Sequence, residues 1–205
     1  MTPEFLTPTI QLAGWALFGY MLGAIPFGIV IARIMGLGDL RQIGSGNIGA
    51  TNVLRTGSKL GAFLTLVFDA GKAGFAVIIA RAFAFEDAAQ LAGFAALLGH
   101  CYPIWLKFRG GKGVATFFGL VFALAWPWGI AAGAVWLAVA AVTRYSSLAA
   151  LVTVAAMTCG SITIGPLSYA ALFGALTVLI IWRHRENIAR LLAGTESKIG
   201  AGKGK

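Results

Sequence analysis

The residues best suited to chemistry form three polar groups, and the first is a glycine-rich segment at 44–52 followed by Arg55. Glycine lets successive backbone N–H groups point into one concavity, and it lets a ligand come close to the chain. An arginine can then hold a phosphate through two hydrogen bonds. The segment therefore predicts an anion site, with a flexible turn between helices as the alternative. Its candidate binding residues are Ser45, Gly46, Asn47, Gly49, Thr51 and Asn52.

The second group lies at 108–116, where a lysine stands inside a glycine loop that leads into an apolar stretch. That stretch is short for a membrane span, since about 14 residues give only about 21 Å of helix. We therefore expect the loop at or below the membrane interface, where irregular backbone is tolerated if it lines a polar cavity. A second anion site is predicted, with a tight helix–helix turn as the alternative. The candidate residues are Gly110, Gly111, Lys112, Gly113 and Thr116.

The third group is C-terminal and begins with His184 and Asn187, which share one face of a helix because they are three residues apart. Glu196 follows them in a short polar stretch. The alternative is a basic tail that binds anionic lipid head groups, and this alternative suits Lys203 and Lys205 best.

Isolated polar residues elsewhere have structural explanations that come first. Ser146 or Ser147 could face a site, or one of them could cap a helix. Asp69 and Lys72 lie three residues apart in an apolar stretch, where ionisable groups are costly and usually paired, so we expect an intramembrane ion pair. A proton relay is the functional alternative for this pair. His100 is expected to be a structural residue.

Several kinds of catalytic site are excluded because the sequence lacks their motifs. It contains no Walker A motif, no HExxH or other metal-ligand cluster, and no Gly-x-Ser-x-Gly nucleophile elbow. We therefore expect no metal site and no cofactor. The three polar groups hold few carboxylates and several cations, which suits the binding of phosphate groups.

The composition requires that this chemistry take place in or at a membrane. Of the 205 residues, 59% are hydrophobic and 11% are charged, and the mean hydropathy is +0.84. Soluble domains carry about 25% charged residues, so an ordinary soluble enzyme and a disordered chain are excluded. The net charge of +9 would suggest nucleic acid in a soluble protein. Here the basic loops of a membrane protein explain it, and no nucleic-acid partner is expected.

Seven apolar segments are predicted to be transmembrane helices, which makes the chain an all-α integral membrane protein with one polytopic domain over residues 1–205. All Lys and Arg residues except Lys72 and Arg81 are expected on one side, which the positive-inside rule makes cytoplasmic. The N-terminus is then outside, and the C-terminus and glycine-rich loops are cytoplasmic. The segments are residues 8–34, 60–83, 89–106, 113–126, 128–143, 147–164 and 167–182.

Two functions from different classes suit this arrangement. Two basic glycine loops suit two phosphates and the apolar helices suit a lipid tail, which together indicate an enzyme acting on lipid phosphates. The rival is a small polytopic membrane transporter, in which broken helices and the Asp69–Lys72 pair would line a path. The polar groups gather on one face instead of crossing the membrane, and this favours the enzyme.

Three motifs in this order resemble the bacterial PlsY family of membrane acyl-phosphate:glycerol-3-phosphate acyltransferases. The resemblance covers nearly the whole chain. It implies transfer of a fatty acyl group from acyl phosphate to the sn-1 hydroxyl of glycerol-3-phosphate. The products are 1-acyl-glycerol-3-phosphate (lysophosphatidate) and inorganic phosphate, in phospholipid biosynthesis. The motifs are Gly44–Asn52 with Arg55, His100-x-x-Pro103 with Phe108-x-Gly110-Gly111-Lys112-Gly113-x-Ala115-Thr116, and Asn187-Ile188-x-Arg190-Leu191-x-x-Gly194-x-Glu196-x-Lys198.

The resemblance also implies the setting of the enzyme and its donor. It places the protein in the bacterial cytoplasmic (inner) membrane, with the active site facing the cytoplasm and lipid around it. Its oligomeric state is left open, and a monomer is compatible with it. Acyl-CoA is not the donor in this family. The sequence agrees, because the His-x-x-x-x-Asp motif of acyl-CoA enzymes is missing: Trp105 stands five residues after His100, and Ala189 after His184.

By the same resemblance, five catalytic residues should hold glycerol-3-phosphate, and the glycine loops with Ser45, Asn47 and Thr51 should cradle the phosphate of the donor. Ser147 is preferred to Ser146 because the family pattern is a serine directly before leucine. The five residues are Arg55, Lys112, Ser147, His184 and Asn187.

The roles of Glu196 and of the proton acceptor follow from chemistry. Glu196 is expected to position the loops through hydrogen bonds. Acyl phosphate is already activated, so no protein nucleophile is needed. The hydroxyl proton goes either to the phosphate of the donor or to His184 as general base, and both routes stay open.

Overall fold

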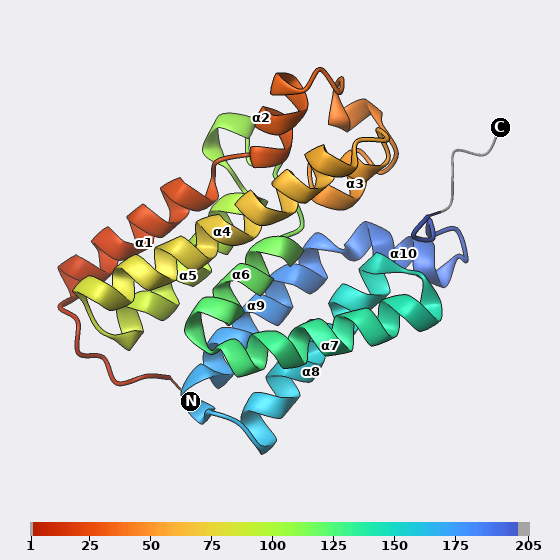
Figure 1. Cartoon of the computed structure of the whole chain (residues 1–205). Coiled ribbons are helices and arrows are strands. Elements are labelled where there is room, and N and C mark those ends of the chain that lie inside the picture. Colours follow the sequence, from red (N-terminus) through yellow and green to blue (C-terminus); the bar gives the residue numbers. More distant parts are fainter. Residues whose placement is uncertain (1, 201–205) are drawn as a thin grey trace. The chain divides into compact units, whose positions relative to one another are not determined.

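The computed structural model describes residues 2–200, and in this range all regular secondary structure is helical. Of the described residues, Glu4–Leu124 form a compact N-terminal unit, and residues 125–200 together with residues 2–3 form a C-terminal unit. Lys203 and Lys205 lie outside the described residues. The α-helices are α1 Thr9–Gly23, α2 Phe27–Ile34, α3 Ala50–Leu54, α4 Lys59–Phe83, α5 Glu86–Cys101, α6 Val114–Leu124, α7 Trp126–Thr143, α8 Ser146–Thr163, α9 Ala170–Arg183 and α10 Arg185–Leu192 (Figure 1).

Four helical stretches are long and apolar enough to cross a membrane: Thr9–Ile34 across α1 and α2, and the helices α4, α7 and α8. A fifth results if the bent pair Leu167–Arg183 and Arg185–Leu192, with 62° between its halves, counts as one span. The helix α6 is apolar but shorter. Each of the seven expected apolar segments overlaps extensively with at least one α-helix, and four or five helical stretches meet the requirements for a span.

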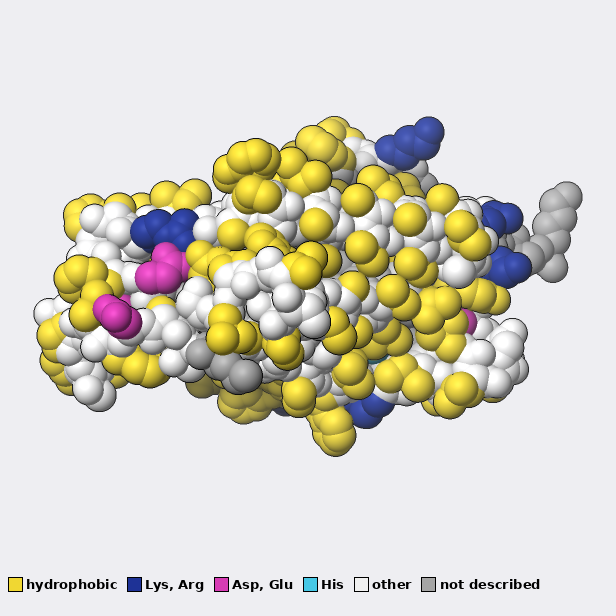
Figure 2. Space-filling view, turned by 90° about the horizontal axis from the view of Figure 1, so that it is seen from below, with side chains coloured by type: hydrophobic (Ala, Val, Ile, Leu, Met, Phe, Trp, Pro, Cys, Tyr) yellow, Lys and Arg dark blue, Asp and Glu magenta, His cyan; other side chains and the backbone are white. Residues whose placement is uncertain are grey.

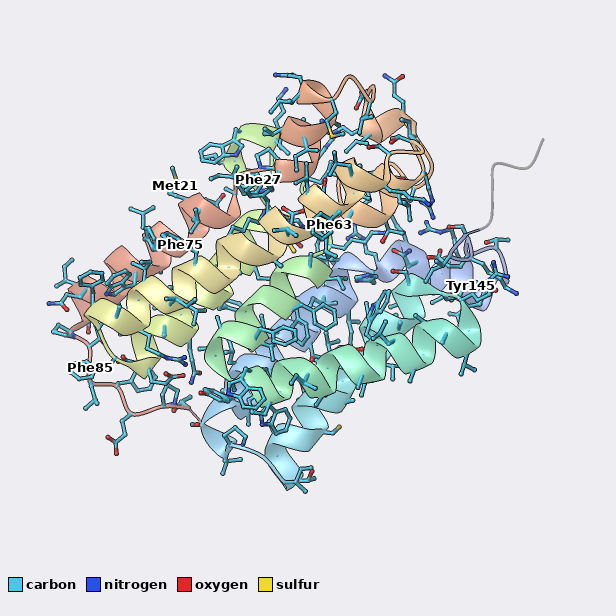
Figure 3. All side chains as sticks on the ribbon, viewed as in Figure 1. Met21, Phe27, Phe63, Phe75, Phe85 and Tyr145 are labelled. Carbon is cyan, nitrogen blue, oxygen red and sulfur yellow. The ribbon has the colours of Figure 1, made fainter. Side chains whose placement is uncertain are left out.

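The outer surface of these helices is apolar, as a lipid environment requires. Figure 2 shows one face of the molecule on which hydrophobic side chains cover most of the area and charged side chains are few. On α4, Phe63 is 60% exposed and Phe75 is 53% exposed; both are labelled in Figure 3. In a soluble protein such a surface would be a liability, whereas in a bilayer it faces hydrocarbon chains.

Within the N-terminal unit, α1 packs on α5, and α4 packs on both α5 and α6. Glycines allow the backbones to approach closely, as is common where helices associate in membranes. A Cβ atom on Gly19 of α1 would collide with the backbone of Ala92 in α5, and one on Gly23 with that of Ala96. Small residues at these contacts therefore fix how tightly the two helices pack.

The first apolar segment is broken between α1 and α2 instead of forming the single helix expected. Pro26 has no N–H group and disfavours helical geometry in the residue before it. At the break, two backbone carbonyl oxygens accept hydrogen bonds from side chains that are distant in the sequence. Trp105 Nε1 donates to the carbonyl of Ala24 at 2.6 Å, and Lys72 Nζ donates to that of Ile25 at 2.9 Å.

Two further helix boundaries differ from those expected because of prolines. The helix α5 ends at Cys101 instead of continuing to residue 106, because Pro103 disfavours helical geometry in the residue before it. The helix α7 begins at Trp126 instead of at residue 128. Pro127 lies in its first turn, where the missing N–H would have no helical partner.

The C-terminal unit is built from α7, α8 and α9, with α10 following a bend. The helices α8 and α9 are joined by a hydrogen bond of 2.8 Å between the hydroxyls of Thr158 and Thr177. At the start of α7, the ring of Trp128 packs against Phe173 of α9, with 5.8 Å between the ring centroids. These contacts hold the three helices side by side.

Candidate functional site

The first glycine-rich segment forms a loop that leads into α3, and its glycines have conformations that other residues avoid. Gly44 has a φ of +54° and Gly46 a φ of +68°. A Cβ atom on Gly44 would lie 2.6 Å from Arg55 Cδ and 2.7 Å from Asn52 Oδ1. The arginine and the asparagine therefore lie directly against the loop only because a glycine stands there.

Asn52 organises this loop from the inside. It is 1% exposed, and its Nδ2 donates to the carbonyl of Leu40 at 2.8 Å. Its Oδ1 accepts from the backbone N–H of Ser45 at 3.1 Å and from Arg55 Nη1 at 3.3 Å. Both the nitrogen and the oxygen of the Asn52 amide are thus hydrogen-bonded within the protein. Because Ser45 and Arg55 donate to the same oxygen, the two residues lie close together.

The other candidate residues of the first loop are more accessible. Ser45 and Thr51 are exposed, while Gly46 and Asn47 are half-buried. Gly49 caps the N-terminus of α3, and a Cβ atom there would lie 3.2 Å from Asn47 Nδ2.

The second glycine loop rests on the C-terminal end of α5. The N–H of Gly110 donates to the carbonyl of Cys101 at 3.1 Å, and the N–H of Gly111 donates to that of His100 at 3.0 Å. A Cβ atom on Gly110 would collide with the carbonyl oxygen of His100, and one on Gly111 with its Nε2. Lys112, which is half-buried, follows directly, so the seating of these glycines sets where its backbone lies.

Gly113 and Thr116 complete the entry into α6. Gly113 has a φ of +82°, and its carbonyl accepts from the N–H of Phe117 at 2.7 Å, which starts the helix. Thr116 is fully buried, and its Oγ1 has no hydrogen-bond partner in the described part of the chain. The structure therefore puts this candidate residue inside the protein and not on its surface.

The ion pair expected between Asp69 and Lys72 is confirmed. Lys72 Nζ lies 2.9 Å from Asp69 Oδ1, and both side chains are nearly inaccessible. Sequence spacing could not reveal the third member, because His100 lies 28 residues further along, with its Nδ1 at 2.9 Å from Lys72 Nζ. His100 thus belongs to a buried charged group and also supports the second glycine loop.

In the C-terminal unit, the carboxylate of Glu196 gathers three side chains. Its Oε1 accepts from Ser147 Oγ at 2.7 Å and from Asn187 Nδ2 at 2.6 Å, and its Oε2 accepts from Arg190 Nε at 2.7 Å. Burial raises the pKa of this carboxyl, but the three hydrogen bonds and the charge of Arg190 outweigh burial and hold the pKa below its ordinary value. Glu196 is therefore ionised near neutral pH.

Of the two adjacent serines, Ser147 is the one that reaches this cluster. It is 6% exposed and bonded to Glu196, whereas Ser146 is the first residue of α8. Arg190 was absent from the expected site residues. The signal for it in the sequence was its place six residues before Glu196, at the end of a short basic helix.

His184 lies at the bend between α9 and α10 and is 2% exposed. Its Nδ1 lies 2.8 Å from the carbonyl oxygen of Ile180. A carbonyl only accepts hydrogen bonds, so Nδ1 carries the hydrogen, and in the neutral ring Nε2 is the nitrogen that can accept a proton. The fold thus selects one tautomer of this histidine.

The polar tail is held against the turn between α7 and α8. The N–H of Ile199 donates to the carbonyl of Arg144 at 2.7 Å, and Arg144 Nη2 donates back to the carbonyl of Ile199 at 3.0 Å. Lys198 Nζ lies 5.7 Å from the ring centroid of Tyr145, which Figure 3 labels. These contacts place Glu196 beside the start of α8.

The chemistry that these groups offer is the binding of anions. The N-terminal unit presents two glycine loops with Arg55 and Lys112, and the C-terminal unit presents Ser147, His184 and Asn187. Among the described residues, no three His, Cys, Asp or Glu side chains lie close enough to hold a metal ion. Backbone N–H groups, hydroxyls and cations are the usual ligands of phosphate.

Comparison with known proteins agrees on one family. The profile described as glycerol-3-phosphate acyltransferase matches residues 13–194. The chain is 60% identical over 200 residues to the glycerol-3-phosphate acyltransferase of Jannaschia sp. (strain CCS1), covering 98% of each chain. It is 60% identical over 198 residues to that of Ruegeria pomeroyi, covering 97% of this chain and 98% of the relative.

Solved structures show the same likeness. The crystal structure of PlsY, an integral membrane glycerol 3-phosphate acyltransferase, in its glycerol 3-phosphate form is 38% identical, with a TM-score of 0.86. The likeness covers 93% of this chain and 96% of that one. The lysophosphatidic acid form of PlsY is 37% identical, with a TM-score of 0.85.

Proposed function

The chain belongs to the glycerol-3-phosphate acyltransferase family, and from this premise we propose that it moves a fatty acyl group from acyl phosphate to the sn-1 hydroxyl of glycerol-3-phosphate. It is a membrane acyltransferase, and acyl transfer to glycerol-3-phosphate is its activity. The observation that carries this conclusion is the likeness over 93% of the chain to PlsY in its glycerol 3-phosphate form. The products are lysophosphatidate and inorganic phosphate.

In the N-terminal unit, Arg55 and Lys112 are the proposed cationic ligands of the phosphate group of glycerol-3-phosphate. Arg55 is held at its loop by Asn52, and Lys112 follows two glycines whose N–H groups are tied to α5. The two glycine loops, with Ser45, Asn47 and Thr51, cradle the phosphate of the donor. Preorganised donors of this kind stabilise charge that develops on the carbonyl and on the leaving phosphate.

In the C-terminal unit, Ser147, His184 and Asn187 are the proposed ligands of glycerol-3-phosphate. Ser147 and Asn187 both donate to the carboxylate of Glu196, which fixes their orientation. Glu196 is therefore a positioning residue, since its two oxygens already accept three hydrogen bonds from the protein. A hydroxyl such as that of Ser147 can accept from a ligand while it donates to Glu196.

Two groups are candidates to accept the proton of the attacking hydroxyl. Acyl phosphate is already activated, so its own phosphate can take the proton while the C–O bond forms and phosphate leaves. His184 is the rival, because the bond of Nδ1 to the carbonyl of Ile180 leaves Nε2 as the basic nitrogen. Binding and orientation of the two substrates supply much of the rate enhancement in either case.

We further propose that both units belong to one polytopic domain in the inner membrane. The family profile runs through both, from residue 13 to 194. Seven spans, an outside N-terminus and a cytoplasmic C-terminus are supported by the distribution of Lys and Arg. The glycine loops and the active site then face the cytoplasm, where glycerol-3-phosphate is available.

The identity of the product tests this function. Purified protein in detergent is given palmitoyl phosphate and labelled glycerol-3-phosphate, and the lipid product is separated and analysed for the position of its acyl chain. We expect 1-acyl-glycerol-3-phosphate. An active enzyme whose product carries its acyl chain at sn-2 would refute the proposed regiochemistry.

A further inference from the structure

A buried charged group at the centre of the N-terminal unit has no part in the function proposed above. Lys72 Nζ lies 2.9 Å from Asp69 Oδ1, 2.9 Å from His100 Nδ1 and 2.9 Å from the carbonyl oxygen of Ile25. It also lies 5.8 Å from the ring centroid of Phe27, which Figure 3 labels at the start of α2. Asp69, Lys72 and His100 are 2%, 4% and 5% exposed.

Burying this charged group costs free energy. Ionisable side chains within membrane helices are expensive, and replacing a buried ion pair with apolar residues is often neutral or stabilising. The Lys72 ammonium forms an ion pair with Asp69, donates to the carbonyl of Ile25 and lies within hydrogen-bond distance of His100 Nδ1. What such a group provides is a fixed geometry that apolar packing would not enforce.

The geometry that it fixes is that of the His100 ring. His100 Nδ1 lies 2.9 Å from Lys72 Nζ and 3.5 Å from Asp69 Oδ1, so the charged pair holds this edge of the ring. On the opposite edge, His100 Nε2 faces Gly111 so closely that a Cβ atom there would collide with it. The backbone carbonyl of His100 also accepts the N–H of Gly111 at 3.0 Å, so one residue contacts the loop through both its ring and its backbone.

We propose that His100, held in place by Lys72 and Asp69, is a positioning residue that seats the Gly110–Gly113 loop and so sets where Lys112 stands. This role rests on the proposed function, in which Lys112 binds phosphate. It differs from a proton relay, because no proton moves. The charged group acts by fixing the position of the His100 ring. Misplacing a catalytic group by about 1 Å can cost about 100-fold in rate.

Two variants of His100 test the hydrogen bond from Lys72. His100→Ala removes the ring, and His100→Asn keeps an acceptor close to the place of Nδ1. We expect His100→Ala to lower kcat by about 100-fold, with a much smaller change in the KM for glycerol-3-phosphate, and His100→Asn to recover part of the kcat. Equal kcat in the two variants, both well folded by thermal unfolding, would overturn the role of the Lys72 bond.

A double-mutant cycle tests the seat of the loop without relying on absolute rates. Gly111→Ala places a methyl group where the ring of His100 stands, so we expect it to lower kcat strongly in the wild-type background. In the His100→Ala background the space is open, and Gly111→Ala should have little further effect. The control is Gly14→Ala, because nothing lies within 4 Å of a Cβ atom there. Additive effects of the two changes would contradict the proposal.

Hydrogen exchange separates a failure of this inference from a failure of the proposed function. Exchange of the backbone amides in residues 104–116 is followed in wild type and His100→Ala, with residues 147–163 as the reference. We expect faster exchange in the loop alone. Unchanged exchange would overturn the seating role even if the enzyme is active. Faster exchange in a protein that shows no acyl transfer would support the seating role and refute the proposed function.

Discussion

Glu196 shows at the scale of one residue how the site is ordered. Its carboxylate accepts from Ser147 on α8 and from Asn187 and Arg190 on α10, so one side chain joins two helices. Asn52 does the same in the N-terminal unit, where it joins Leu40, Ser45 and the catalytic candidate Arg55. In both places a buried polar residue holds the groups that are proposed to touch substrate.

Loss of the Glu196 charge should therefore loosen its three partners. We expect Glu196→Gln to destabilise the protein by about 1.5–3 kcal/mol, since hydrogen bonds to charged groups are worth about that much, and to reduce activity. Thermal unfolding in detergent and turnover measure the two effects. Glu186→Gln on the exposed face of α10 is the matched control. Equal stability of the two variants would show that the hydrogen bonds of Glu196 contribute nothing to the stability of the protein.

The stability contributed by Glu196 should depend on pH in the acid range. Its pKa is lower in the folded protein than in the unfolded chain, despite burial, because of its hydrogen bonds and Arg190. The stabilisation is therefore complete above the unfolded pKa and is lost as the pH falls through the folded pKa. We expect the difference in Tm between wild type and Glu196→Gln to shrink as the pH is lowered. A difference that stays constant into strong acid would contradict this.

Lys112 should be needed for turnover and not for folding. We expect Lys112→Ala to reduce kcat by at least about 100-fold, as removal of one charge-stabilising donor does in other enzymes, while Tm changes little. Arg109→Ala, three positions away on an exposed part of the same loop, is the control for loss of a nearby positive charge. Full activity of Lys112→Ala would remove this lysine from the site.

At the scale of elements, helix packing in the N-terminal unit depends on small residues. A Cβ atom on Gly19 would collide with the backbone of Ala92, whereas nothing lies within 4 Å of one on Gly14 of the same helix. We expect Gly19→Ala to destabilise the protein by about 1–3 kcal/mol, the usual cost of overpacking. Gly14→Ala should be neutral or slightly stabilising. Thermal unfolding of both variants checks this, and equal Tm values would refute the packing argument.

The positions of the helices were predictable because apolar runs, prolines and glycines mark them directly. The apolar pattern does not predict the break before α2, because the residues on both sides of Pro26 are apolar and form one continuous segment. The start of α7 was misplaced for a related reason. The expected segments 113–126 and 128–143 leave Pro127 between two helices, whereas proline is favoured in the first turn of a helix.

In the site, spacing predicted what is local and could not predict what is distant. The pairing of Asp69 with Lys72 is predictable from the sequence because the two residues are three positions apart on one helix. The contact of Lys72 with His100 joins residues 28 positions apart, and that of Ser147 with Glu196 joins residues 49 apart. Only the fold reveals such partners.

At the scale of the whole molecule, the number of membrane crossings decides where the chain ends lie. Seven spans, or five, place the N-terminus and α10 on opposite sides of the membrane, whereas four spans place them on the same side. We expect Glu4→Cys to react with an impermeant maleimide from outside intact cells, and Glu186→Cys to react only after permeabilisation. Labelling of both from the same side would exclude an odd number of spans.

The central claim is that this membrane protein transfers an acyl group from acyl phosphate to glycerol-3-phosphate. Its most direct test supplies purified, folded protein with glycerol-3-phosphate and either palmitoyl phosphate or palmitoyl-CoA, and follows lysophosphatidate and inorganic phosphate together. We predict product from palmitoyl phosphate alone, with one phosphate released for each lysophosphatidate formed. Product from palmitoyl-CoA alone, or from neither donor, would contradict the account, and the second result would turn attention to solute flux in sealed vesicles.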